Sequence, residues 1–244
     1  MFRLAVSALL SLVASAVSAV ECENVSFENN RYTICEVDPQ AEDLRLFLDD
    51  ETGNPYGQFS RLDSKLNARA LTLEFAMNAG MYHPDRSPVG YYKEGEETRR
   101  GLITSASAGN FGLLPNGVFC IAEGRAEVFE TLLFEALRPS CRFASQSGPM
   151  LVIDGALHPR FLRDSTSRYL RNGVGTSSDG SRVVFAISNN PVTFYQFGRL
   201  FQSALSLPNA LYFDGNVSRL HAPKLGRSDI GRAMGPIVGV VGRQ

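Results

Sequence analysis

The sequence lacks the features that mark several large classes of protein. Its charge is nearly balanced, with 24 Lys and Arg against 25 Asp and Glu, and the basic residues form no block. No nucleic-acid partner is therefore expected, because such binding relies on a concentrated positive surface. Beyond the first residues, no apolar run approaches the length that spans a membrane. The mature chain is therefore expected to carry no membrane span.

Common hydrolase and phosphate-site signatures are also absent. The sequence has no G-x-S-x-G elbow, no H-E-x-x-H and no P-loop. Its three histidines, His83, His158 and His221, each stand alone, so a metal site built from several histidines is not expected. His83 keeps a functional interpretation because it lies in a long loop. No cofactor is expected, and a divalent cation stays open as an alternative.

The first 19 residues have the pattern of a secretory signal peptide. Arg3 supplies a positive charge, residues 4–17 are mostly apolar, and Val17-Ser18-Ala19 supplies small residues at a cleavage site. We predict cleavage after Ala19. The mature protein would then be periplasmic or secreted.

The four cysteines fit an exported protein; they are Cys22, Cys35, Cys120 and Cys141. An even count in an oxidising compartment suggests two disulfides. Pairing Cys22 with Cys35 and Cys120 with Cys141 would close the shortest loops, but four cysteines allow three connectivities.

Residues 20–244 are long enough for one well-buried domain. Short apolar runs predict strands at 32–37, 44–48, 71–77, 150–153, 182–187, 210–213 and 236–241. Helices are predicted at 60–70 with Ser60 as N-cap, at 131–137, and from Pro191-Val192-Thr193 to Pro208. Residues 110–122 are predicted to form a hairpin, and the charged residues 91–100 an exposed, mobile segment. Many strands with few helices indicate an α+β class: a single domain with a twisted, mostly antiparallel or mixed sheet and a few packing helices.

Four motifs place a polar side chain beside a glycine at an end of an apolar run. They are Asn78-Ala79-Gly80-Met81-Tyr82, Gln146-Ser147-Gly148-Pro149, Arg171-Asn172-Gly173-Val174-Gly175 and Asp214-Gly215-Asn216-Val217-Ser218. Taken singly, each is most simply a turn. If the four ends converge, they form one polar site. Such a site suits an anionic, hydroxyl-rich substrate, because Arg binds phosphate bidentately and a carboxylate can attack or stabilise a cationic sugar centre.

In this order, the motifs resemble those of the phosphodiester glycosidase family. That family combines an Asn-Gly/Ala-Gly-aromatic-aromatic turn, a Ser/Gly-Gly pair before a strand, an Arg-Thr-Ala-Ile-Gly-like element and an Asp-Gly-Gly-Gly-Ser-like loop. The resemblance covers roughly residues 71–241, and residues 77–82 and 146–152 are most similar to a bacterial branch. Four positions depart from the pattern: Met81 replaces an aromatic, Asn172 and Gly173 replace Thr-Ala, and Asn216 replaces a glycine.

The resemblance implies an exported hydrolase that cleaves the glycosidic bond of a sugar-1-phosphodiester in a cell-envelope or extracellular glycan. Arg171, with N–H groups near Ser147 and Gly148, would hold the phosphate, and Asp214 would act as nucleophile or base. Asn78 and Tyr82 would bind sugar hydroxyls, and His83 or Asp85 would be a second acid or base. The remaining predicted substrate-binding residues are Gly80, Gln146, Gly175, Gly215, Asn216 and Ser218.

Two alternatives stay open. The same pocket could belong to a non-catalytic binding module for an anionic envelope polysaccharide, or to a cation-dependent enzyme. The sugar, its anomeric configuration, the aglycone and the oligomeric state are not predicted.

Overall fold

The computed structural model describes residues 20–244. The predicted signal peptide, residues 1–19, lies outside the described residues, so its cleavage and the export of the protein stay predictions. Within the described chain, no helix is long and apolar enough to cross a membrane.

Residues 20–244 form three sheets, and neighbouring strands in them are antiparallel. The seven-stranded sheet has the order β1 (Glu21–Phe27), β2 (Asn30–Val37), β13 (Val183–Ser188), β12 (Asn172–Thr176), β14 (Asn209–Asp214), β10 (Met150–Ile153) and β11 (Ala156–Leu157). One five-stranded sheet has the order β16 (Arg227–Ser228), β15 (Leu220–Ala222), β4 (Leu71–Asn78), β17 (Ile237–Arg243) and β3 (Asp43–Phe47). The other has the order β6 (Glu97–Arg100), β5 (Tyr92–Glu94), β9 (Phe143–Ser147), β7 (Gly117–Ala122) and β8 (Arg125–Glu130).

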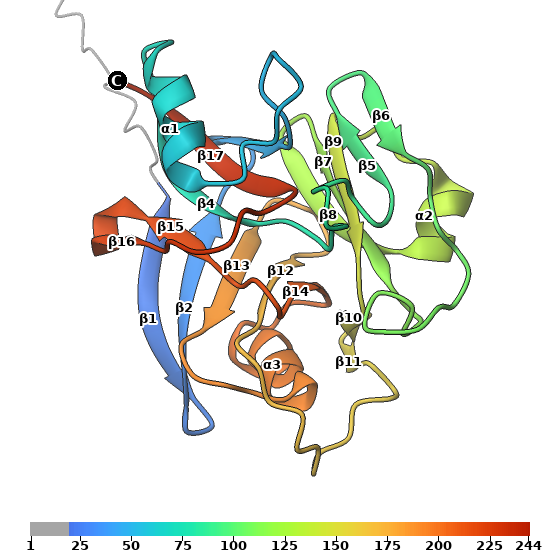
Figure 1. Ribbon diagram of the computed structural model, residues 1–244. Coiled ribbons are helices and arrows are strands. Elements are labelled where there is room, and N and C mark those ends of the chain that lie inside the picture. The colour runs from blue at the N-terminus through green and yellow to red at the C-terminus, as the bar shows by residue number, and fades with distance from the viewer. Residues whose placement is uncertain (1–19) are drawn as a thin grey trace, which may run out of the picture.

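Short helices cover the outside of these sheets (Figure 1). They are α1 (Phe59–Asn67), α2 (Thr131–Leu137) and α3 (Phe194–Arg199), which continues into a π-helical turn at Leu200–Ala204; a 3-10 turn lies at Pro223–Leu225. The helix α1 begins after Gln58 rather than at the predicted cap Ser60. The start of α3 is as the sequence indicates, because Thr193 and Gln196 form a reciprocal capping box.

The molecule is mostly β, so it is more β-rich than the α+β class that the sequence predicted. The strands β1 and β6 were not predicted, because their side chains are mostly exposed and carry no apolar pattern. Their backbone pairing with β2 and β5, rather than buried apolar side chains, defines them as strands.

Two predicted segments are wrong in detail. Residues 110–116 are irregular, and the hairpin forms later, between β7 and β8. The reason is Asn116, whose buried side chain donates to the Phe111 carbonyl at 3.0 Å and accepts from Thr131 Oγ1 at 2.7 Å, which fixes a loop. Residues 91–100 form the β5–β6 hairpin rather than a mobile segment, because Tyr92 is fully buried in the core.

Four phenylalanines join the three sheets at the centre of the core. The rings of Phe75 and Phe185 lie 4.8 Å apart, and Phe119 lies 5.8 Å from Phe185 and 6.2 Å from Phe213. These residues belong to β4, β13, β7 and β14, so each sheet contributes at least one ring. Full burial of each ring stabilises the fold by about 1.5–3 kcal/mol. Phe213 therefore anchors the end of β14 firmly in the core.

Two disulfides reinforce the fold at separate places. Cys22–Cys35 joins β1 to β2, and Cys120–Cys141 joins β7 to the segment before β9. These are the two pairings that close the shortest loops.

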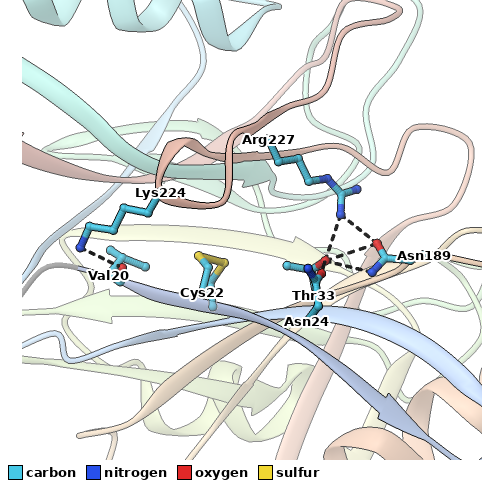
Figure 2. Close-up of a disulfide and its surroundings, with 8 residues drawn as sticks. Val20, Cys22, Asn24, Thr33, Asn189, Lys224 and Arg227 are labelled. Carbon is cyan, nitrogen blue, oxygen red and sulfur yellow. Dashed lines mark hydrogen bonds between the residues drawn. A yellow bond between two sulfur atoms is a disulfide. The ribbon is translucent and has the colours of Figure 1, made fainter.

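A polar network beside the first disulfide connects two of the sheets (Figure 2). Arg227 of β16 donates to Thr33 Oγ1 at 3.1 Å and to Asn189 Oδ1 at 2.8 Å. Thr33 Oγ1 in turn donates to Asn24 Oδ1 at 2.7 Å. The edge of the five-stranded β16–β3 sheet is thereby tied to β1 and β2.

Candidate active site

A cavity of about 470 Å³ lies beyond the end of β14, next to the start of β12 and the loop that follows β4. Its lining residues are Met81, Tyr82, Val89, Gly109, Asn110, Ser167, Tyr169, Arg171, Tyr212, Asp214, Gly215 and Asn216. Three of the four strand-end motifs therefore meet in one place. The fourth, around Gln146, does not reach the cavity.

Asp214 is the last residue of β14 and lines the cavity. The pairing with β12 shifts register here, so that Asn172 faces Asp214 while Gly173 faces Tyr212, and Phe213 bulges into the core. Asp214 Oδ1 accepts the backbone N–H groups of Gly215 at 2.6 Å and Asn216 at 2.9 Å. Within residues 20–244, no hydrogen bond engages Oδ2, which leaves that oxygen for a ligand.

Burial raises the pKa of Asp214 above its ordinary value, and the hydrogen bonds from the backbone of residues 215–217 oppose this rise only in part. A carboxylate with a raised pKa in a cavity is a common property of catalytic groups. The carboxyl can thus exchange a proton nearer to neutral pH than a surface aspartate can.

Arg171 enters the cavity from the start of β12, and its side chain is almost completely buried. Its Nε donates to the Val192 carbonyl at 3.0 Å and its Nη2 to the Ser167 carbonyl at 3.2 Å. Its Cζ lies 3.6 Å from the centre of the Phe194 ring. These contacts hold the guanidinium plane in one orientation.

No carboxylate in the described chain forms a salt bridge with Arg171, and nothing there accepts a hydrogen bond from its Nη1. Burial lowers the pKa of Arg171, yet a guanidinium stays charged at neutral pH. A buried cation without a partner is costly. The arrangement is therefore suited to receive an anion.

Asn78 lies behind the cavity wall rather than in it. Asn172 Nδ2 donates to both the side-chain and the backbone oxygen of Asn78 at 3.0 Å, and Asn78 Oδ1 also accepts the N–H of Arg219 at 3.0 Å. Asn172 Oδ1 accepts the backbone N–H of Asp214 at 3.3 Å. The two buried amides thus connect β4 in one sheet to β12 and β14 in another, directly behind Asp214.

The predicted residues Gln146, Ser147 and Gly148 are also structural neighbours of the cavity rather than parts of its lining. The amide of Gln146 bonds the backbone of Tyr91 and Ile103, which fixes the loop between β6 and β7. Ser147 Oγ donates to the Phe213 carbonyl at 2.9 Å, and Gly148 packs on Asn116. This motif supports the end of β14 from the core side.

Of the other predicted binding residues, Tyr82, Gly215 and Asn216 line the cavity. Tyr82 donates to the Ala233 carbonyl at 3.2 Å, and burial, followed by the charge of Asp214, raises its pKa. Ser218 Oγ donates to the Asp214 carbonyl at 3.0 Å and so braces the turn from outside the cavity.

Gly80, Gly175, His83 and Asp85 do not line the cavity. A side chain at Gly80 would collide with Ser145, and one at Gly175 would collide with Phe201. Asp85 Oδ1 accepts both the N–H and the hydroxyl of Ser87, so it caps its own turn, and these bonds lower its pKa. The structure therefore brings neither candidate for a second acid or base to Asp214.

Six cavity residues were not singled out from the sequence: Val89, Gly109, Asn110, Ser167, Tyr169 and Tyr212. Tyr212 lies in the apolar run that predicted β14, and an aromatic residue in such a run is normally assigned to the core. The register shift between β12 and β14 breaks the alternation of side chains at Phe213, so no strand pattern in the sequence shows that Tyr212 and Asp214 line the same cavity.

Residues 20–244 contain no group of three or more His, Cys, Asp or Glu side chains that could hold a metal ion. The cofactor requirement of the protein stays a prediction. Chemically, the cavity combines one carboxylate, one uncompensated guanidinium, three phenols and the amides of Asn110 and Asn216.

Comparison with known proteins shows what this chain resembles. The family model described as phosphodiester glycosidase matches residues 72–234. The chain is 31% identical over 216 residues to the uncharacterized protein YigE of Escherichia coli (strain K12), covering 88% of this chain and 83% of that protein. The crystal structure of a hypothetical protein from Synechocystis has a similar fold, with a TM-score of 0.59 and 13% identity over 92% of this chain. The matched region is 62% of the chain in that crystal structure.

Proposed function

This chain belongs to the phosphodiester glycosidase family, and on that premise we propose that it is an exported hydrolase that cleaves the glycosidic bond of a sugar-1-phosphodiester. Its substrate would be a phosphorylated carbohydrate of the cell envelope or the extracellular space. The supporting observation is that Asp214 and an Arg171 without a carboxylate partner in the described chain line one cavity. The two disulfides are compatible with export.

The roles follow from the two charged groups. A phosphodiester carries one negative charge, which matches the one uncompensated guanidinium of Arg171. Asp214 would face the anomeric carbon with its free Oδ2, as nucleophile or as base for water. Phosphate leaves readily, so this bond can break without the second carboxylic acid that ordinary glycosidases use.

Asn78 and His83 take other places in this mechanism than the sequence predicted. We assign Asn78 to the support of Asp214 through the buried amide of Asn172. His83 lies outside the cavity lining and receives no step.

The substitution Asp214→Asn tests the proposal against a matched control. Both Asp214 and Asp179 precede a glycine and accept the N–H two residues later, at 2.9 Å and 3.1 Å. Removal of a catalytic carboxylate is expected to lower kcat by about a thousandfold or more, whereas Asp179→Asn is expected to retain turnover. The measurement is hydrolysis of a panel of sugar-1-phosphodiesters, followed by mass spectrometry. Wild-type rates in the Asp214 variant would remove it from the mechanism.

A second candidate function is a non-catalytic module that binds an anionic envelope polysaccharide. It is favoured by the fact that Asp214 is the one carboxylate in the cavity lining of the described chain. Binding of anionic glycans without any product across the panel would support the module over the hydrolase. Loss of product formation on addition of a chelator would instead support a cation-dependent enzyme.

A further inference from the structure

Tyr212 lines the cavity together with its two charged groups, Arg171 and Asp214. It precedes Asp214 by two residues on β14, across the bulge at Phe213. Its ring centre lies 5.4 Å from Cζ of Arg171. The edge-to-face contact with Phe194, at 4.8 Å between ring centres, fixes the ring, and only 1% of the residue is exposed. The phenol therefore points along one defined direction.

The hydroxyl of Tyr212 occupies space that Gly215 leaves free. A Cβ atom on Gly215 would overlap this hydroxyl oxygen, so no other residue type fits there without displacing it. Gly215 itself lines the cavity. The Tyr212 hydroxyl thus lies at the base of the Asp214 turn.

The O–H of Tyr212 is a donor without an acceptor. In the part of the chain that the structure describes, no carbonyl or carboxylate accepts a hydrogen bond from it. The Arg171 guanidinium donates toward the Tyr212 oxygen but cannot accept its proton. The hydroxyl of Tyr32 lacks a partner in the described chain, but it is sealed in the core, away from the cavity. Burial raises the pKa of Tyr212, and Arg171 opposes this rise only in part, so the phenol stays protonated at neutral pH.

We propose that Tyr212 is a catalytic residue, which donates a hydrogen bond to the phosphate oxygen that departs from the sugar while Arg171 holds the phosphate. This inference rests on the proposed function. The C1–O bond breaks and its electron pair stays on the phosphate oxygen, which gains negative charge. The proton stays on Tyr212, because a phosphate monoester has a pKa of about 6 and cannot deprotonate a phenol. Tyr212 therefore takes the place of the second acid as a fixed donor to a developing charge.

The substitution Tyr212→Phe tests the donor by removing one oxygen atom. A donor to developing charge contributes to the transition state, so we expect kcat to fall about a hundredfold while KM changes less than about threefold. Tyr32→Phe is the matched control, since it removes a buried, unpartnered hydroxyl outside the cavity, and it is expected to keep wild-type kcat. A change in KM alone, or a kcat within about threefold of wild type, would overturn the inference.

A binding measurement separates this inference from the proposed function. Methyl phosphate carries the charge of the leaving group and contains no glycosidic bond. Calorimetric titration is expected to show about tenfold weaker binding of methyl phosphate to Tyr212→Phe than to wild type, as the loss of one charge-assisted hydrogen bond implies. If wild type hydrolyses no sugar phosphodiester, the proposed function fails. The titration still tests the role of Tyr212, because equal binding of methyl phosphate by both proteins would overturn it.

The role of Gly215 supplies a second test. Gly215→Ala is expected to lower kcat strongly in the wild-type background, because its Cβ collides with the hydroxyl. In the Tyr212→Phe background the same change meets the ring carbon Cζ at an ordinary 3.4 Å, so little further loss is expected. Full additivity of the two substitutions would contradict the proposed link between glycine and hydroxyl.

Discussion

Two Asp-Gly turns with the same local sequence have opposite environments in this protein. Asp179 is exposed at the tip of the β12–β13 hairpin, where hydrogen bonds from Ser177 and Ser181 lower its pKa to about 2. Asp214 ends a core strand, and its burial raises its pKa. Both carboxylates accept the backbone N–H two residues later. The two turns therefore share their backbone hydrogen bonds. The difference in burial determines what each carboxylate can do.

The largest effect is expected at Arg171, which lines the same cavity as Asp214, whereas Asp179 does not line that cavity. Arg171→Met removes the cation of the cavity, and we expect kcat/KM to fall by about three orders of magnitude or more. Stability is expected to stay level or to rise, because a buried unpaired charge is replaced by an apolar side chain. Steady-state kinetics and urea unfolding check this. A large loss of stability together with retained turnover would reduce Arg171 to a structural residue.

A smaller difference is expected from the residues that brace each turn. Asn172→Ala removes the amide behind Asp214 and leaves Asn78 without its partner, which costs about 1–3 kcal/mol in unfolding free energy. We also expect kcat to fall about tenfold, since Asp214 loses its support. Ser177→Ala removes the brace of the exposed turn and is expected to cost less than about 1 kcal/mol. Urea unfolding of both variants measures the two costs, and equal values would contradict the contrast.

The smallest effect is a difference of sign in the pH dependence of stability. Asp214 has a raised pKa in the folded state, so its contribution to stability falls as pH rises from the ordinary aspartate value to the raised value. Asp214→Asn should therefore gain stability relative to wild type across that interval. Asp179 has a lowered pKa, so its contribution is present above the ordinary value and is lost as pH falls toward about 2.

Thermal unfolding, measured in small pH steps from acid to neutrality, compares Asp214→Asn and Asp179→Asn with wild type. Because the two carboxyl groups have pKa shifts of opposite direction, the stability differences are expected to change with pH in opposite directions. The same direction for both variants would contradict the assigned environments.

The sequence predicts the positions of Asp214 and Arg171 well, because each lies at the end of an apolar strand and its neighbours match a family pattern. It does not predict whether the other polar side chains line the cavity or are buried behind its wall. Asn78 and Gln146, like Asp214, lie close before a glycine at the end of a strand. Their side-chain amides, however, form hydrogen bonds with buried backbone and side-chain groups. Those partners include Asn172 and Ile103, which come from distant parts of the chain, so no local pattern reveals them.

Tyr212 shows the opposite error. Its aromatic side chain fits the core in composition, and its ring does pack against Phe194. Only the arrangement of β12 beside β14 shows that its hydroxyl reaches the cavity. The β-rich class was underestimated for a related reason, since edge strands such as β1 depend on pairing with a neighbour.

The amide pair of Asn78 and Asn172 has a consequence for when the protein becomes active. These residues lie on different sheets, so a chain that has formed its separate hairpins still has no support for Asp214. Hydrolysis is then expected only from the completely assembled molecule. If the protein is exported as proposed, it becomes active only after it has crossed the membrane and assembled, so sugar phosphates inside the producing cell would escape hydrolysis without any inhibitor.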